Sequence, residues 1–260
     1  VAECVNRNRK EDIKKISNLV YKEKDEVIFN KLEPLTDSED YWFSPSMEKV
    51  KRYVIENNIV EEGTVFIKNI LDKDPAYVGE YYTMVGRGCL WDCSFCSGGR
   101  FYMKYRENEV PIKRRRLRSI ECVIKELKNT KEKYHFKKIF FMDSYFTAPV
   151  SYIIEFFKVY KDEINLPFFA QFFSPQVFKN PEILKSAYEA GLSHTVVGIQ
   201  SGSERLSSDI MNRRESNENL LKFANMICQY ENVLLDYHLV THNPFETKDD
   251  ILETFDLLGE

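Results

Sequence analysis

The sequence predicts an α/β protein, a partial TIM-type barrel of parallel strands with helices packed on its outside. From about residue 79 onward, short apolar runs alternate with amphipathic stretches. Successive strand–helix units form a parallel sheet covered by helices. Polar residues or glycine follow each apolar run, as expected at the sheet edge that carries the chemistry. An open, doubly wound sheet would show the same alternation.

The composition is that of a folded, soluble chain, with 43% hydrophobic and 30% charged residues among 260. A net charge of −4 argues against a nucleic-acid or membrane-surface binder, so neither partner is expected. No apolar run reaches the roughly 18 to 20 residues of a membrane span. Six cysteines would suit a disulfide framework only in a short secreted chain. We therefore expect a reducing, cytoplasmic location.

Two regions differ in character. Residues 1–78 are expected to form an N-terminal connecting segment, and residues 79–260 the core domain. Because the chain has no initiator Met and ends directly after a helical pattern, we expect it to be a piece of a longer protein.

Within the connecting segment, apolar residues 19–21 and 27–29 flank a charged stretch, which predicts a small hairpin. A short helical pattern surrounds Val50, Tyr53 and Val54. No residue of this segment indicates a reaction.

In the core domain, apolar runs bounded by polar residues predict five strands. They cover residues 82–85, 139–142, 168–173, 194–199 and 233–240. Helices between and after them are marked by apolar stripes at helical spacing. The stripes are Ile120, Val123, Ile124 and Leu127; Ile153, Phe156, Phe157 and Tyr160; Leu220, Phe223, Ala224, Ile227 and Cys228; and Ile251, Leu252, Phe255 and Leu258. Capping signals support them: Ser119 and Thr247 as N-caps, and a helix that starts at Asn180-Pro181 and ends at Gly191.

Three cysteines lie close together just after the first strand. Cys89, Cys93 and Cys96 have the spacing C-x3-C-x2-C, so their thiolates can converge on one metal centre. No fourth cysteine or histidine follows within the next twenty-five residues. Three thiolates would hold an iron–sulfur cube with one iron open to a ligand. The alternative is a structural zinc site completed by His135 or His242.

The cysteine motif, with Phe95 before its third cysteine, resembles the signature of the radical S-adenosylmethionine (radical SAM) superfamily. Further motifs resemble that family in the same order along the chain, from about Tyr81 to Glu260. They are Gly198-Ile199-Gln200-Ser201-Gly202-Ser203, Met211-Asn212-Arg213 and Pro244-Phe245-Glu246-Thr247. The segments 116–119 and 141–146 are most similar to the branch associated with a cobalamin-binding domain. Such a domain would have to precede Val1.

The resemblance implies a [4Fe–4S] cluster and S-adenosyl-L-methionine as cofactors. Cys89, Cys93 and Cys96 would be the cluster ligands, and Phe95 would lie near the adenine. In the family, one electron from the cluster cleaves the cofactor to methionine and a 5′-deoxyadenosyl radical, which abstracts a substrate hydrogen. No catalytic residue beyond cluster and cofactor is implied.

The same resemblance implies contacts at the strand ends. Asp143 or Ser144 would meet the ammonium of the methionine moiety, and Gln200 and Ser201 would reach the ribose or carboxylate.

Three positions depart from the family pattern: Gln200 stands where glutamate is frequent, Phe173 where an arginine is common, and Phe245 where glycine is usual. These departures concern the S-adenosylmethionine contacts more than the cluster.

For the overall reaction we expect a radical SAM enzyme acting on a small molecule, either a cobalamin-dependent methyltransferase or a cyclase. Its electron donor would be a flavodoxin or ferredoxin. One alternative is a methylthiotransferase-type enzyme with an RNA or ribosomal-protein partner. Another is a non-catalytic iron–sulfur electron carrier or sensor.

Other polar features receive structural interpretations. The basic run Lys113–Arg118 is expected to be a solvated loop before a helix. Cys228 lies on an apolar stripe and is expected in the core, whereas Cys122 is expected to be an exposed bystander. His238 falls inside a strand, and His242, just beyond it, is the better functional candidate of the two.

Overall fold

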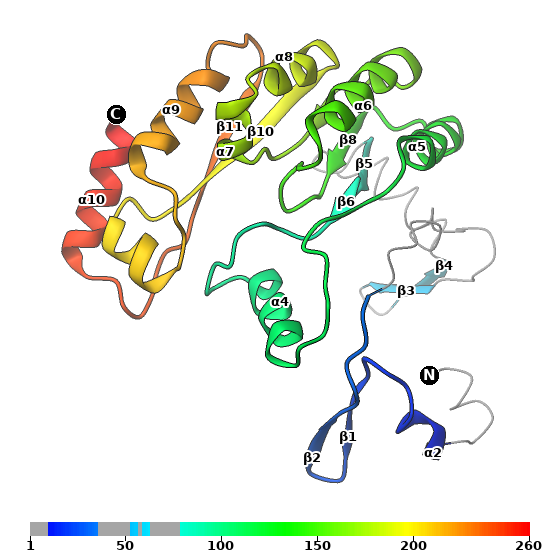
Figure 1. Cartoon of the computed structure of the whole chain (residues 1–260). Coiled ribbons are helices and arrows are strands. Elements are labelled where there is room, and N and C mark those ends of the chain that lie inside the picture. Colours follow the sequence, from blue (N-terminus) through cyan, green and yellow to red (C-terminus); the bar gives the residue numbers. More distant parts are fainter. Residues whose placement is uncertain (1–9, 36–52, 57–58, 63–78) are drawn as a thin grey trace.

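A five-stranded parallel sheet forms the centre of the protein, in the order β11-β10-β9-β8-β5 (Figure 1). The structure, a computed structural model, describes residues 10–35, 53–56, 59–62 and 79–260. The strands are β5 (Glu80–Thr83), β8 (Lys138–Phe141), β9 (Phe168–Phe169), β10 (Leu192–Gln200) and β11 (Leu234–Leu239). Four strands match their predictions to within about two residues. The third is shorter than predicted, because Phe172 makes only an isolated bridge to Phe146.

The strand order separates the two architectures that the sequence left open. Each strand pairs with the strands next to it in the succession β5, β8, β9, β10, β11, so the sheet grows in one direction. A doubly wound sheet would reverse at a switch point. The fold is therefore the predicted partial TIM-type barrel, with β5 and β11 as its open edges.

Helices lie along the outer side of the curved sheet (Figure 1). They are α5 (Ile120–Tyr134), α6 (Val150–Glu163), α7 (Ser174–Lys179), α8 (Glu182–Glu189), α9 (Asn217–Ile227) and α10 (Lys248–Gly259), with a short π-helix, η2 (Leu206–Ile210), before α9. The helix predicted to start at Asn180-Pro181 is α8, with Pro181 and not Asn180 as its N-cap. The predicted N-caps Ser119 and Thr247 are confirmed: the Ser119 hydroxyl accepts from the backbone N–H of Cys122, and Thr247 forms a reciprocal capping box with Asp250. Each cap satisfies an N–H that the helix leaves free.

Aromatic side chains fill the space between α6 and the sheet. Phe141, Phe156, Phe157, Tyr160 and Phe168 are at most 1% exposed. The Phe141 ring meets those of Phe156 and Phe168 edge-on, each with centroids 5.6 Å apart, and Phe157 stacks on Phe168 at 5.3 Å. Rings of this size bury 150–250 Å² each. The middle of the sheet therefore holds the main apolar core.

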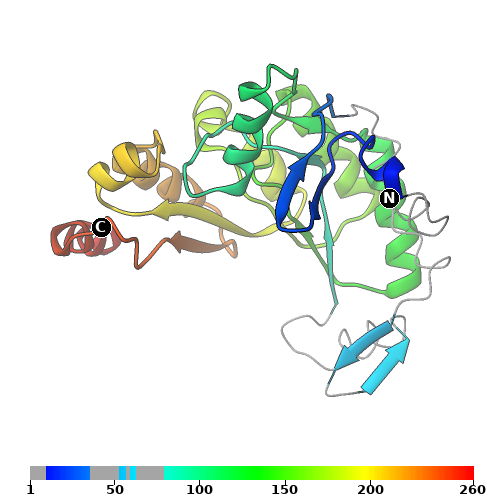
Figure 2. The ribbon, with the colours of Figure 1, turned by 90° about the horizontal axis from the view of Figure 1, so that it is seen from below.

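The N-terminal part contributes two antiparallel hairpins (Figure 2). The predicted hairpin is confirmed as β1 (Val20–Glu23) and β2 (Glu26–Phe29), after a short helix, α2 (Lys10–Ile13). The second hairpin joins β3 (Tyr53–Glu56) and β4 (Ile59–Glu62), so the helical pattern predicted at Tyr53 and Val54 is wrong. The β-branched residues in both strands favour the extended state over a helix. Val50 lies outside the described residues.

Three further elements lie between β5 and α5. β6 (Gly86–Arg87) pairs antiparallel with β7 (Arg116–Leu117), and α4 (Ser97–Glu107) lies between them in the chain. Figure 1 shows α4 on the inner side of the curve, opposite the outer helices. These elements carry the cysteine motif to the open mouth of the partial barrel.

The C-terminal end is less buried than its pattern suggests. α10 forms as predicted, but Leu252 and Phe255 of its apolar stripe are 49% and 66% exposed. Cys228 is also exposed, contrary to the prediction that it lies in the core, because it sits at the C-terminal cap of α9. Within the described residues, no helix has the length and apolar character needed to cross a membrane.

Candidate active site

The cysteine motif forms a loop at the C-terminal edge of the sheet, between β6 and α4. Cys96 is the N-cap of α4, and Cys93 is 6% exposed, whereas Cys89 and Cys96 are half-buried. Burial raises the pKa of both the Cys89 and Cys93 thiols, and the neighbouring cysteines of the motif add to the effect. The sulfurs are therefore near enough to influence one another's charge.

Ligating geometry is not yet in place in this loop. Among the described residues, no three histidine, cysteine or acidic side chains are gathered closely enough to hold a metal ion. The three thiols nevertheless fit an iron–sulfur cube, because they are soft ligands that share one short loop.

Hydrogen bonds tie the cysteine loop to the turn after η2. The backbone N–H of Ser94 donates to the Met211 carbonyl at 2.9 Å, and the Ser94 hydroxyl donates to the Ile210 carbonyl at 2.5 Å. The Asn212 side-chain amide donates to the Asp92 carbonyl at 2.9 Å. The Met-Asn-Arg motif of the sequence thus lies against the cysteine motif, although some 120 residues separate them.

Arginines of the basic run tie the loop region to the barrel from the other side, so the prediction of a solvated run is wrong for them. Arg114 pairs with Asp92 in the cysteine loop at 2.5 Å. Arg115 pairs with Asp143, and the buried Arg118 pairs with Glu126. The sequence of a basic run does not show which acidic residues pair with it. Here each acidic partner comes from another element, so the run looked solvated.

A buried arginine and three aromatic rings pack together beside Cys93, in what we call the Arg213 cluster. Arg213 is 5% exposed, pairs with Glu215 at 3.2 Å, and donates to the Tyr145 hydroxyl at 3.3 Å. Its guanidinium lies 5.9 Å from the centre of the Trp91 ring, and Trp91 meets Phe173 edge-on at 5.6 Å. The Phe173 ring in turn contacts that of Tyr145.

The electrostatics of the Arg213 cluster favour a positive charge on the Arg213 guanidinium. Burial disfavours the charged guanidinium of Arg213, but Tyr145 and Glu215 outweigh this effect and raise its pKa. Arg213 also hydrogen-bonds the Cys93 thiol and partly opposes the burial that raises the thiol pKa. Two buried donors, Nε of Arg213 and Nε1 of Trp91, have no partner within the described residues. An anionic group beside the cysteines would supply acceptors for them.

Asp143 has a different position from the one predicted for a cofactor contact. Its side chain is 0% exposed, accepts from the backbone N–H groups of Val85 and Gly86 at 2.9 and 2.8 Å, and pairs with Arg115 at 2.5 Å. Burial raises the pKa of Asp143, while Arg115 and the two N–H groups oppose the shift. In this conformation the Asp143 carboxylate anchors the turn into the cysteine loop. Ser144 is exposed.

Gln200 lies at the end of β10 in a left-handed conformation with φ +67°. Such a conformation is unfavourable for a residue with a side chain and is concentrated at functional sites. A Cβ on Gly198 would lie 2.6 Å from Nε2 of Gln200 and 3.5 Å from an Arg213 nitrogen. Glycine at position 198 therefore lets the Gln200 carboxamide and the Arg213 guanidinium share one small space.

The remaining predicted contacts differ from each other in accessibility. Ser201 is 1% exposed, and its hydroxyl accepts from the Ser203 backbone N–H within the turn towards α9, so it faces the protein interior. Phe95 is 46% exposed on the cysteine loop. The structure thus places Cys93 and Gln200 next to Arg213, leaves Phe95 exposed, and buries Asp143 and Ser201.

The topology of the sheet argues against His135 as the fourth ligand of a zinc site. His135 is the C-cap of α5 and precedes β8, so it lies at the N-terminal edge of the sheet. The cysteines follow β5 at the opposite edge. His242 is exposed and lies beyond β11, the edge strand farthest from β5, with its ring against the Thr241 hydroxyl. His238 is exposed on β11.

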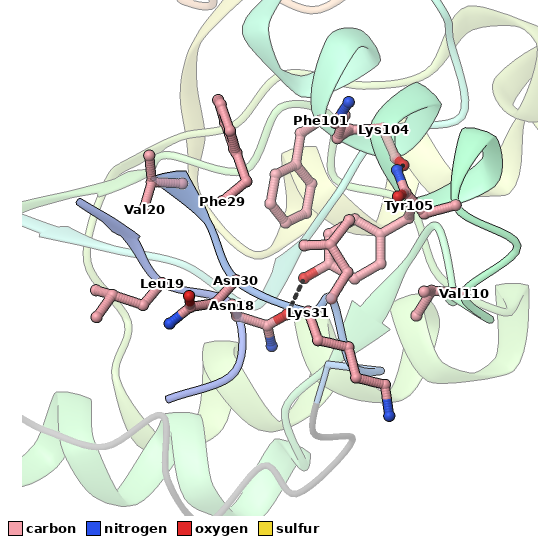
Figure 3. A pocket seen from close by; sticks show the side chains of 12 residues that line it. Asn18, Leu19, Val20, Phe29, Asn30, Lys31, Phe101, Lys104, Tyr105 and Val110 are labelled. Carbon is pink, nitrogen blue, oxygen red and sulfur yellow. Dashed lines mark hydrogen bonds between the residues drawn. The ribbon is translucent and has the colours of Figure 1, made fainter. Parts of the chain in front are cut away.

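A separate groove of about 600 Å³ lies between the N-terminal hairpin and α4 (Figure 3). Phe29 and Phe101 line it, and the Tyr105 hydroxyl reaches Asn18 at 3.5 Å. Among the described residues that line it, Lys31 and Lys104 are the charged ones. Because it holds no acid–base pair and no thiol, we do not place the chemistry there.

The sequence alone did not indicate the residues that build the Arg213 cluster. Arg213 was noticed only as part of a motif, and Trp91, Tyr145 and Glu215 were given no role. The available signals were a tryptophan between two motif cysteines and an acidic residue two positions after the arginine. Neither signal indicates which of the distant elements meet at the barrel mouth.

Comparison with known proteins defines the class to which this fold and site belong. The family model of the radical SAM superfamily matches residues 83–258, more than half of the chain. The chain therefore belongs to the radical SAM superfamily, whose enzymes use a [4Fe–4S] cluster and S-adenosylmethionine. A search of curated protein sequences gives no significant match.

Solved structures add two relatives by fold. One is the cobalamin-dependent S-adenosylmethionine radical enzyme OxsB with aqua-cobalamin bound, at TM-score 0.69 and 17% identity, covering 100% of this chain and 34% of that one. Another is the radical S-adenosylmethionine methyltransferase TsrM from Kitasatospora setae with tryptophan and a SAM analogue bound, at TM-score 0.64 and 14% identity, covering 99% and 46%. This chain spans about a third of OxsB and under half of TsrM.

Proposed function

We propose that this chain is the catalytic core of a radical SAM enzyme in which Cys89, Cys93 and Cys96 hold the [4Fe–4S] cluster. The observation that carries the proposal is the position of the three thiols, on one loop at the C-terminal edge of the barrel and beside the buried guanidinium of Arg213. When bound, the cluster supplies the electron that cleaves S-adenosylmethionine reductively. The remaining tasks belong to the protein: binding, orientation and exclusion of water.

Arg213 is our candidate for binding the carboxylate of the methionine moiety. Its Nε is buried without a partner within the described residues, and Glu215 and Tyr145 hold the guanidinium in place. The family pattern places an arginine at the position of Phe173, and here the Phe173 ring contacts Trp91, over which Arg213 lies. The positive charge would thus come from the turn after η2 in place of the third strand.

Gln200 and Phe95 complete the proposed cofactor contacts. The Gln200 carboxamide lies next to Arg213 and can donate or accept a hydrogen bond. The exposed ring of Phe95 is available to pack against the adenine. Ser144 is exposed and stays a candidate for the ammonium, whereas Asp143 would act by anchoring the loop.

We further propose a cobalamin-dependent reaction on a small molecule, a methyl transfer or a cyclisation, with cobalamin held by a domain that precedes residues 1–78. Support comes from the likeness in fold to OxsB and TsrM. The structural matches to these two proteins cover 84% to 100% of this chain. In this proposal residues 1–78 connect that domain to the core at 79–260. A cytoplasmic location agrees with the five described cysteines, all of which are free thiols. A flavodoxin or ferredoxin would supply the electron.

The experiment is anaerobic reconstitution with iron and sulfide, followed by incubation with dithionite and S-adenosylmethionine. Formation of 5′-deoxyadenosine by the wild type, and its loss in Cys93→Ala but not in Cys228→Ala, is the expected result. A protein that assembles the cluster but yields no 5′-deoxyadenosine would instead support the electron-carrier or sensor reading. No residue of the Arg213 cluster favours methylthiotransferase activity.

A further inference from the structure

We propose that Arg114 and Asp92 form a positioning pair that holds the cysteine loop ready for the cluster and tunes the charge beside it. The inference rests on the proposed function, since it concerns the same cluster. The two residues come from different segments, Asp92 from between the motif cysteines and Arg114 from the arm before β7.

Arg114 binds the spacer between Cys89 and Cys93 at two points. Its Nη1 donates to the Leu90 carbonyl at 3.1 Å, and its Nη2 donates to the Asp92 carboxylate at 2.5 Å. The planar guanidinium can satisfy a carbonyl and a carboxylate at once, which a lysine ammonium on a flexible stem does less well. One side chain thus restrains the loop conformation on both sides of Trp91.

The backbone around Arg114 is fixed as firmly as its side chain. The Tyr102 hydroxyl donates to the Arg114 carbonyl at 2.7 Å, and the Arg114 guanidinium lies 5.9 Å from the centre of the Tyr102 ring. Gly88, with φ +104°, approaches so closely that a Cβ there would lie 1.7 Å from the same carbonyl. Residue 88 directly precedes the first cysteine. The arm therefore provides a rigid support for the loop.

Because both residues of the pair are charged, they should affect the reduction potential of the cluster, which an uncharged structural contact would not do. Asp92 places a negative charge next to Cys93, and Arg114 compensates it. Net charge around an iron–sulfur cluster is one determinant of its reduction potential. Removing Arg114 should lower the potential, because reduction adds negative charge beside an uncompensated carboxylate. Removing the Asp92 charge should raise it.

The test compares Arg114→Met and Asp92→Asn with Arg106→Met as the matched control. Arg106 faces the same carboxylate, but at 3.9 Å and with its side chain 68% exposed. In reconstituted protein, we expect a chelator to remove iron about ten-fold faster from Arg114→Met, the scale of losing a hydrogen bond between charged groups. The reduction potential should fall in Arg114→Met, rise in Asp92→Asn, and stay unchanged in Arg106→Met.

A second readout uses the metal-free protein. Alkylation of Cys93, followed by mass spectrometry, should be about ten-fold faster in Arg114→Met than in the wild type, while alkylation of the exposed Cys228 keeps its rate. If Arg114→Met does not fold, Arg114→Lys and Asp92→Asn take its place in the alkylation assay, each with a smaller increase in the rate at Cys93. Equal alkylation rates, or potentials that move the same way in Arg114→Met and Asp92→Asn, would overturn the pair's role. A wild type with restrained Cys93 that assembles no cluster would instead refute the proposed function.

Discussion

The middle of the sheet and the cysteine loop are stabilised in opposite ways. Between β8, β9 and α6, aromatic rings such as Phe141, Phe156 and Phe168 pack together with almost no exposed surface. Around the cysteine loop, ion pairs and hydrogen bonds to backbone groups hold the chain, through Arg114, Arg115 and Asn212.

This difference indicates which part depends on the metal. Apolar burial scales with the area removed from water and needs no ligand, so the core should fold without a cluster. The loop keeps its thiols within electrostatic reach but not in ligating positions. Cluster binding should therefore leave the stability of the core largely unchanged.

The largest expected effect tests the core. Phe156→Ala removes a ring with 0% exposure that contacts Phe141, Phe146 and Tyr160. Truncations of this kind cost about 3–5 kcal/mol, because the lost transfer free energy is joined by that of the cavity. Urea unfolding of the metal-free protein, followed by circular dichroism, would measure it. A loss under about 1 kcal/mol would mean that this ring is not part of the main core.

A buried ion pair gives the next effect. Arg118→Met leaves the Glu126 carboxylate without its cation, while Tyr81 and Thr83 still donate to it. Breaking one partner of a buried pair costs about 3 kcal/mol, mainly from the uncompensated charge. The double variant Arg118→Met/Glu126→Gln should recover part of the loss in the same urea assay. No recovery would show that packing, and not charge, determines the effect.

A smaller effect, dependent on pH, is expected at the start of α10. Arg205, Ser203 and Thr247 hydrogen-bond the Asp250 carboxylate and hold its pKa well below the usual range. A lowered folded-state pKa stabilises the fold above the unfolded pKa of about 4, and this contribution is lost as the pH falls further. Asp250→Asn should therefore lower the melting temperature between pH 5 and 8, with a difference from wild type that shrinks below pH 4. A difference that is constant down to pH 2 would contradict this account.

The smallest effect should come from the exposed face of α10. Phe255 is 66% exposed, so Phe255→Ser should change the free energy of unfolding by less than about 0.5 kcal/mol. It should, however, reduce the binding of a hydrophobic dye to the folded protein, because exposed apolar patches bind such dyes. A loss as large as that of Phe156→Ala would show that this face is covered in solution.

Periodicity and capping residues predicted most of the fold, since they depend on local sequence. The stripe of α6 was predicted as well as that of α10, yet only the first is buried, because a stripe shows which face is apolar and not what covers it. The strand order, which separated a barrel from a doubly wound sheet, also depends on distant pairing.

The site was predicted unevenly for the same reason. The three cysteines are adjacent in sequence and carry their own signal. The residues of the Arg213 cluster come from four segments that are distant in sequence. The left-handed conformation of Gln200 belongs to the bulge at the end of β10. The resemblance implied that Asp143 or Ser144 contacts the cofactor, but it did not indicate that Arg115 and two backbone N–H groups, all distant in sequence, bind the Asp143 carboxylate.

The most direct test of the central claim is the iron and sulfide content of single-cysteine variants after anaerobic reconstitution, measured together with the unfolding of the same proteins without metal. Wild type and Cys228→Ala should bind about four irons and four sulfides per chain. Cys89→Ala, Cys93→Ala and Cys96→Ala should lose the cluster, while their metal-free free energies of unfolding stay within about 1 kcal/mol of the wild type. A full complement of iron and sulfide in Cys93→Ala would contradict the account.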